Sequence, residues 1–139
     1  MAEIVGLASG ALTLATFAFT CTVELSNLVQ SFQNHPKRVR DLLTELECLR
    51  GVLDSLKDTI QGLPDVDFSV IKLPLLRCGK ACDEFQQEIM KCSSRSNKDR
   101  TSFRDWAKLR YLGDDIDGFR QALGSYSLTI NVAIADANL

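Results

Sequence analysis

The chain has 139 residues, of which 45% are hydrophobic and 24% charged, and its net charge is −2. This composition excludes a disordered chain and is typical of a globular domain large enough to bury a core. The slightly acidic balance argues against a general nucleic-acid binder, because such proteins present strongly basic surfaces. Five Cys, an odd number, with no secretory signal ahead of them, predict free thiols in a reducing compartment.

A first helix is expected over about residues 2–33. Its stretch from Ile4 to Val23 carries no charge, and a helix of that length spans about 30 Å, the thickness of a bilayer's hydrocarbon core. Its several threonines make it a weak membrane anchor. The absence of any basic residue before Lys37 makes it a poor signal peptide.

In water such a helix has to be covered by partners on most of its sides. Gly6 and Gly10 form a small-xxx-small pattern, which permits close contacts between helices. We expect the larger apolar side chains of this helix to be covered by the rest of the chain or by a second copy: Leu12, Phe19, Val23 and Leu28.

A second helix is expected to begin at Pro36 or Lys37 and to end at Gly62, shortly before Pro64. Seven apolar residues recur in it at alternating steps of three and four: Val39, Leu42, Leu46, Leu49, Leu53, Leu56 and Ile60. This 3.5-residue repeat predicts a seam that packs on another helix.

The start of a third helix is open between two interpretations, one with Ser69 as its cap and one with Pro74 in its first turn. Its seam has the same repeat: Leu75, Cys78, Cys82, Phe85, Ile89 and Cys92. The polar stretch from Ser93 to Arg100 is expected to be a loop.

The last helical pattern begins near Thr101 or Ser102 and reaches the end of the sequence. Its seam consists of Leu109, Leu112, Ile116, Phe119, Leu123, Tyr126, Ile130, Ala133 and Ala137. Gly113 predicts a kink or a break, after which Asp114 is able to cap a new helix.

Together these patterns predict an all-α fold, an antiparallel four- to five-helix bundle in one domain over residues 1–139. Because the last pattern persists to Leu139 without a clear cap, we expect an N-terminal domain excised from a longer chain. The expected core anchors are Leu49, Leu53, Phe85, Trp106 and Phe119. Nearly complete burial is further expected for Leu46, Ile116 and Leu123.

Reactive groups do not assemble into a catalytic constellation, so neither an enzyme nor a cofactor is expected. His35 is the only histidine, and we interpret it as a solvated loop residue. Cys78, Cys82 and Cys92 have the spacing of one helix face, but they lie on an apolar seam and lack a fourth zinc ligand. The acids after Gly113 are better explained as negative charge at a helix N-terminus than as a metal site.

Basic residues outnumber acidic ones from Lys91 to Arg110. One interpretation is a contact patch for anionic lipid head groups, formed by Arg95, Lys98, Arg100 and Arg104. A solvated loop and helix face is the simpler alternative.

Two segments carry a resemblance to a known family. The opening MAEIVGLASGAL, followed by Cys21 and the stretch from Leu25 to Phe32, resembles the start of the fungal HeLo and HeLo-like domains. The close, DWAKLRY with GDDI and the stretch from Tyr126 to Leu139, is similar to the end of the fungal N-terminal domain of NLR-like (STAND) proteins. A related version of that domain is named for a protein of an azaphilone pigment gene cluster.

The resemblance implies a helical bundle that oligomerises, exposes its N-terminal helix and permeabilises the plasma membrane in fungal cell death or heterokaryon incompatibility. The domain would be cytoplasmic at rest, attached to a receptor module, and would bind an anionic membrane when activated. Carried over to this sequence, the membrane-effector segment comprises Ile4, Val5, Gly6, Gly10, Leu12, Leu14, Phe17, Phe19 and Val23.

The alternative is a non-catalytic scaffold or dimerisation domain in which the first helix stays buried. Leakage of liposomes, with and without forced oligomerisation, separates the two interpretations.

Overall fold

The computed structural model describes residues 2–32, 35, 37–95 and 113–139, and the side-chain surroundings of 10–32, 35, 37–91 and 116–139. Helices make up most of this part: α1 (Ala2–Gln30), α2 (Lys37–Gly62), α3 (Ser69–Arg95) and α5 (Gly113–Ala137). No strand occurs within these ranges, and the predicted all-α bundle is confirmed.

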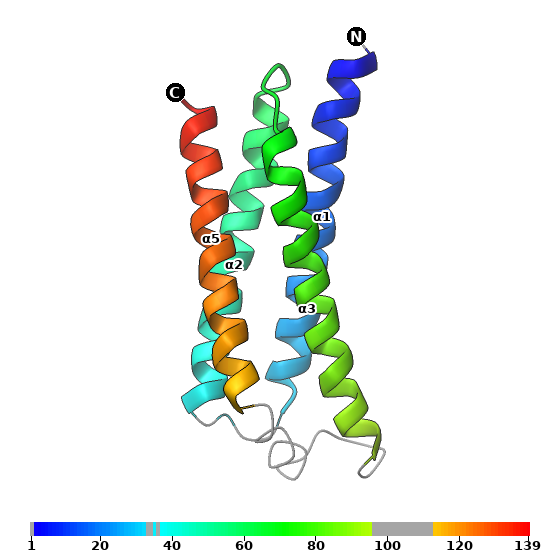
Figure 1. The fold of residues 1–139 in the computed structure, drawn as a ribbon, viewed down its shortest axis with the longest axis vertical. Helices are drawn as coiled ribbons and strands as arrows, with labels where there is room; N and C mark the ends of the chain where they lie inside the picture. Colours follow the sequence, from blue (N-terminus) through cyan, green and yellow to red (C-terminus); the bar gives the residue numbers. More distant parts are fainter. Residues whose placement is uncertain (1, 33–34, 36, 96–112) are drawn as a thin grey trace.

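Successive helices run in opposite directions, so that α1 and α3 point one way and α2 and α5 the other (Figure 1). α1 packs mainly against α3 and α2, α2 also packs against α5, and the contact between α3 and α5 is less extensive. Helices that follow each other in the sequence are therefore antiparallel. Two of the packed pairs, α1 with α3 and α2 with α5, are parallel. α1 lies across the bundle from α5, and both ends of the chain lie at the same end of the bundle (Figure 1).

α1 ends at Gln30, three residues earlier than the expected end at Gln33. The amide of Ser31 already bonds to the carbonyls of both Asn27 and Leu28, at 3.1 Å each, and the chain then leaves the helix. Phe32 follows outside the helix and is buried at 4% exposure, so it closes the lower end of the core.

α3 begins at Ser69, as one of the two interpretations held, but the capping side chain belongs to Asp67. Its Oδ1 accepts the backbone amide of Ser69 at 2.9 Å and the Ser69 hydroxyl at 2.6 Å. These bonds hold the pKa of Asp67 below its usual value. Pro74 lies inside the helix, and at the other end α3 continues to Arg95, so the expectation of a loop from Ser93 onward was wrong for its first three residues.

α5 begins at Gly113, where the sequence predicted an interruption, which places Asp114 in the first turn of the helix rather than before it. The stretch 101–112, including the seam positions Leu109 and Leu112, lies outside the described residues.

The predicted seam of α2 is confirmed, since every one of its seven members is buried. Leu49 and Leu53 have no exposed surface, as expected of core anchors, and Leu46 and Leu123 are equally covered. Residues from all four helices join this single core.

Phe85 departs from the predicted core, because it is only partly buried. Its ring stacks on that of Phe119 with 4.3 Å between the centroids and 3° between the planes. The pair joins α3 to α5, the two helices whose mutual contact is the least extensive of those in the bundle, and both rings line a surface pocket. Trp106, the remaining expected anchor, lies outside the described residues.

Ion pairs join the first turns of α2 and α5. Arg120 reaches Asp117 at 3.6 Å and Asp41 at 3.9 Å, and Arg38 reaches Asp117 at 3.9 Å. Lys37 pairs with Asp41 at 2.9 Å, and this bond, assisted by Arg120, holds the pKa of Asp41 below its usual value. Asp117 thus links α5 to α2 through its pair with Arg38.

Candidate functional site

Helix α1 is the element that the sequence singled out, and its length is that of a membrane span. The 21 residues of Gly10–Gln30 are long and apolar enough to cross a bilayer, a test that the core helix of a globular protein also passes. Only 39% of that span is buried in the bundle, a smaller share than the sequence led us to expect.

The buried face of α1 is made mostly of small residues. It consists of Ala11, Ala15, Ala18, Cys21, Thr22, Leu25, Ser26 and Val29. Small side chains let the axes of neighbouring helices come close, so this face fits α1 against α2 and α3 with little protruding side-chain volume.

Apart from Leu25 and Val29, the larger apolar residues of α1 are not fully buried. Leu12, Phe19, Val23 and Leu28 are all only partly buried and lie at the margins of the contact face. The expectation that the bundle covers them was therefore only partly correct. The reason is geometric: the small residues occupy the centre of the buried face, and the larger ones flank it.

The outer face of α1 carries hydroxyl and amide groups. Thr13, Thr16 and Thr20 are exposed there, followed by Glu24 and Asn27. These positions recur every three to four residues, so they form one stripe along the helix. α1 is thus a weakly amphipathic helix rather than one that is apolar all round.

All residues of the expected membrane-effector segment lie within α1. Ile4, Val5 and Gly6 belong to the helix, but their surroundings lie outside the described part. Partial burial is found at Gly10, Leu12, Leu14, Phe19 and Val23, and Phe17 is exposed at 37%. Where side chains are described, the segment therefore consists of residues that the bundle covers only in part.

Phe17 of α1 packs against Gly79 of α3. A Cβ atom at Gly79 would overlap Cε2 and Cδ2 of the Phe17 ring. The ring therefore lies directly on the backbone of α3, a position that only glycine permits. Gly79 thus serves helix packing.

A second aromatic contact ties α1 to α2. Lys57 of α2 places its Nζ atom 4.5 Å from the centre of the Phe19 ring, within the range of a cation–π interaction. Lys57 and Phe19 are both partly buried, which strengthens such a contact relative to a fully solvated pair.

Three thiols and one hydroxyl meet between α1 and α3. The Thr22 hydroxyl donates to the carbonyl of Ala18 at 2.7 Å and lies 3.7 Å from the sulfur of Cys82. Burial, with smaller contributions from nearby acidic groups, raises the pKa of Cys21 to about 11. Hydrogen bonding with Cys82, and then burial, raise the pKa of Cys78. Cys21 and Cys78 are thus protonated at neutral pH, which makes them poor nucleophiles and poor metal ligands.

No cluster of three or more metal-ligating side chains occurs among the described residues. Cys21, Cys48, Cys78 and Cys82 are free thiols, and the surroundings of Cys92 lie outside the described part. Cys48 is exposed, unlike the three buried thiols. His35 is partly buried between α1 and α2 rather than solvated, and its carbonyl accepts a bond from Arg40 at 3.4 Å.

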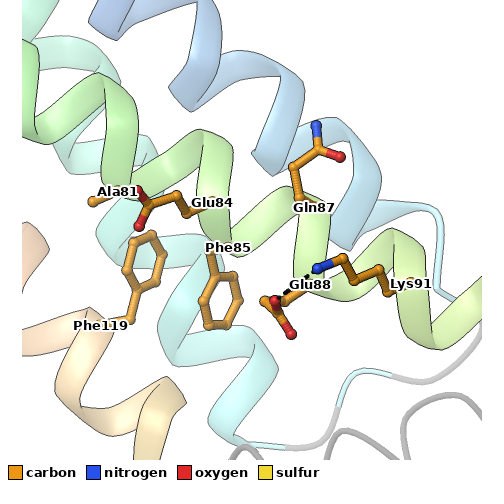
Figure 2. Close-up of a pocket in the computed structure, with 7 residues that line it drawn as sticks. All are labelled: Ala81, Glu84, Phe85, Gln87, Glu88, Lys91 and Phe119. Atoms are coloured by element: carbon orange, nitrogen blue, oxygen red, sulfur yellow. Dashed lines mark hydrogen bonds and ion pairs between the residues drawn. The ribbon is translucent and has the colours of Figure 1, made fainter.

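Figure 2 shows a shallow pocket between α3 and α5, of about 530 Å³. Phe85 and Phe119 form its wall, and the residues around them are Ala81, Glu84, Gln87, Glu88 and Lys91. Lys91 lies 3.5 Å from Glu88, so these two charges are paired. Glu84 is the third charged residue of the lining.

The expected lipid-contact patch falls where side chains are not described. Arg95 is the last residue of α3, and Lys98, Arg100 and Arg104 lie outside the described residues. The patch therefore stays a prediction from the sequence.

Comparison with known proteins gives one match. No curated protein and no solved structure matches the chain. Residues 2–139 match the family described as pigment biosynthesis cluster protein PigL N-terminal, which confirms the pigment-cluster part of the resemblance. The links to HeLo domains and to NLR-like proteins stay predictions. Since the match extends over nearly the whole sequence, this chain belongs to the PigL N-terminal family.

Proposed function

We propose that the chain is a non-catalytic signalling domain that shelters α1 in its bundle at rest and delivers this helix to a membrane after self-association. In this proposal the resting domain is cytoplasmic and attached to a receptor module of a fungal NLR-like protein. The activated domain lies at the anionic face of the plasma membrane, where it permeabilises the bilayer.

The observation that carries the proposal is the way α1 is held. A helix long enough to span a bilayer contacts the bundle mostly through small side chains, with Leu25 and Val29 as the larger exceptions, while its other large apolar residues stay partly exposed. Apolar burial stabilises in proportion to area, at about 25 cal/mol per Å², so a stretch lined by alanines contributes less than a stretch lined by leucines. We therefore expect the part of α1 from Ala11 to Ala18 to be held less strongly than a stretch with the seam of α2.

The threonine stripe favours several copies over a single inserted helix. Hydroxyl groups need hydrogen-bond partners in hydrocarbon, and neighbouring helices can supply such partners to exposed residues such as Thr16 and Thr20. Gly6 and Gly10 add the close approach that such helix pairs require. Membrane delivery therefore depends on self-association in this proposal.

A reversible lock on α1 tests the proposal. The Thr22 hydroxyl lies 3.7 Å from the Cys82 sulfur, so Thr22→Cys places a thiol within reach of a native one. The resulting disulfide would join α1 to α3. We expect the oxidised variant to lose leakage of anionic vesicles under forced oligomerisation, and a reductant to restore it. Ser55→Cys, at an exposed position of α2, is the matched control that leaves leakage unchanged.

A charge on α1 provides a second, independent variant. Thr13→Lys and Thr16→Lys change exposed positions, so the bundle should tolerate them. Each should raise the free energy of insertion by about 2.5 to 3.5 kcal/mol per helix and so suppress leakage. The folded state is checked by circular dichroism, and neutral vesicles are compared with anionic ones in the same assay.

A scaffold function is the second candidate, and the contacts of Thr22 favour it. Its side chain is fully buried and its hydroxyl lies 3.7 Å from the Cys82 sulfur of α3, as expected for a helix that stays in place. If the oligomerised parent does not leak vesicles, or if locked and lysine variants leak them as well as the parent, the effector proposal fails and the scaffold function replaces it.

A further inference from the structure

Two of the contacts between α1 and α3 fall on one turn of α3, from Cys78 to Cys82. The Phe17 ring lies on the backbone at Gly79, and the Thr22 hydroxyl lies 3.7 Å from the Cys82 sulfur. Cys78 and Cys82 are fully buried, and their thiols are hydrogen-bonded to each other across this turn. The turn of α3 that receives α1 thus carries a pair of thiols that the proposed function does not use.

The two thiols differ in acidity, which gives them different roles in oxidation. Hydrogen bonding with Cys78 lowers the pKa of Cys82, and hydrogen bonding with Cys82 raises the pKa of Cys78. Because the thiolate is the nucleophile, Cys82 is the sulfur that attacks an oxidant, and Cys78 is the sulfur that then closes a disulfide. Both side chains are buried in the resting bundle, so a small oxidant reaches them only while α1 has left α3 in a local opening.

A disulfide between these two positions does not fit a regular helix. Residues four apart on a helix have their Cβ atoms about 5 to 6 Å apart, whereas a disulfide needs them about 3.5 to 4.5 Å apart. Closing the bond therefore tightens the turn and moves the Gly79 backbone on which the Phe17 ring lies. It also draws the Cys82 sulfur away from Thr22. The oxidised turn no longer matches the face of α1 that packs on it, because packed interiors do not absorb such shifts without loss.

We propose that Cys78 and Cys82 form a redox site that controls α1: hydrogen peroxide oxidises them to a disulfide while α1 is away from α3, and the disulfide keeps α1 from returning. First the Cys82 thiolate attacks a peroxide oxygen, the O–O bond breaks, and a sulfenic acid and hydroxide form. Then the Cys78 sulfur attacks the sulfenic sulfur, the S–O bond breaks, and the oxygen leaves as water with the proton of Cys78. The inference rests on the proposed function, in which α1 leaves the bundle. The coupling is reciprocal, so a membrane that holds α1 away from α3 also favours the disulfide.

Mass spectrometry of the peroxide-treated chain tests the chemistry, in a background in which Cys48 and Cys92 are replaced by Ser. Trypsin cleaves after Lys80 and so separates the two thiols. The disulfide would therefore join the tryptic peptides 78–80 and 81–91 and remove one hydrogen from each. We expect this linked pair to form with hydrogen peroxide, to form faster under forced oligomerisation on anionic vesicles, and to disappear with dithiothreitol.

Hydrogen exchange in the same background measures the release of α1. Amides of α1 should exchange at least about tenfold faster in the oxidised protein than in the reduced one, whereas amides of α2 should keep their rates. Cys78→Ala and Cys82→Ala each remove one partner of the bond and should abolish this acceleration. Cys21→Ala, which shortens another buried thiol at the same interface, is the matched control that retains it. Circular dichroism confirms that the variants fold.

A disulfide from Cys82 to Cys21 would join α1 to α3 and overturn the inference, as would thiols that peroxide leaves reduced. A bond between Cys78 and Cys82 that leaves the exchange of α1 unchanged would overturn it as well. If oxidation speeds the exchange of α1 but the domain never leaks vesicles, the proposed function fails and the redox site remains. If forced oligomerisation causes leakage while oxidation does not release α1, this inference alone fails.

Discussion

At the scale of single residues, the interface between α1 and α3 is unusual in placing three thiols in a region of low polarity. Cys21, Cys78 and Cys82 are all buried, and Thr22 joins them. The sequence placed Cys78 and Cys82 correctly, because both fall on the apolar repeat of α3. It gave no sign of Cys21 or Thr22, since a polar residue inside an uncharged helix has no preferred face until its neighbours are known.

Because Cys21 is buried, the stability of the fold should decrease at alkaline pH. Its pKa rises from 9.0, the value expected in the unfolded chain, to about 11 in the folded one. The contribution of the neutral Cys21 thiol to the free energy of unfolding is complete below pH 9. It is lost as the pH rises toward 11, because in that window the thiol ionises only in the unfolded chain. A shift of this size corresponds to about 2 to 3 kcal/mol.

Urea unfolding at neutral pH and near pH 11 measures this loss. Cys21→Ala should show a smaller alkaline loss than the parent, whereas Cys48→Ala, at an exposed site, should show the parent's loss. An equal pH dependence in Cys21→Ala and the parent would mean that other groups account for the loss.

At the scale of helices, the sequence predicted α2 best and α1 least well. The repeat from Val39 to Ile60 consists of large apolar residues, and large residues on one face of a helix are buried in almost any bundle. α1 contains a repeat of the same kind in small residues: Ala11, Ala15, Ala18, Thr22, Leu25 and Val29. That signal was available, but the larger residues of the helix obscured it. When two helices pack closely, small side chains can occupy the contact. A bulky apolar side chain is then not necessarily the one that faces the neighbouring helix.

The order of helices in space could not be predicted from the sequence. Short connections favour contact between successive helices, yet α2 and α3 lie diagonally and α1 packs on α3. Gly79 permits the close contact of Phe17 with α3, but a glycine within an apolar repeat does not by itself indicate which helix packs on it.

Gly79→Ala tests the contact between the Phe17 ring of α1 and the backbone of α3. The new methyl group overlaps the Phe17 ring, so we expect a loss of about 1 to 3 kcal/mol in the free energy of unfolding. Gly51→Ala in α2 meets no atom within 4 Å and should stabilise the protein by about 0.5 to 1 kcal/mol. The double variant Phe17→Ala, Gly79→Ala should recover part of the loss, because the overlap is gone. Equal effects at the two glycines would show that α1 does not lie on Gly79.

At the scale of the whole molecule, one core joins all four described helices. The α2 seam contacts both α1 and α5, so α2 supports two neighbours that do not pack extensively against each other. Ion pairs from Arg120 to Asp41 and from Arg38 to Asp117 add a polar connection at one end of the α2–α5 pair. The fold should therefore unfold as one unit when α2 is weakened.

Leu49→Ala is the corresponding test. Leu49 has no exposed surface, so its truncation should cost about 2 to 5 kcal/mol and lower the urea midpoint equally for secondary and tertiary probes. Cys48→Ala, next to it and exposed, should change stability by less than about 0.5 kcal/mol. A loss below that value at Leu49 would show that the seam does not face the core.

Both ends of the chain lie at the same end of the bundle, and this decides how the protein responds to mechanical force (Figure 1). Tension applied between residues 2 and 139 acts first on the outermost turn of α1 and separates it from α2 and α3 turn by turn. The alternative geometry, with the ends at opposite poles, would load every contact of α1 at once in shear. An anchored C-terminal side and a bilayer pulling on the N-terminal side would thus detach α1 progressively, while α2, α3 and α5 keep their contacts with one another.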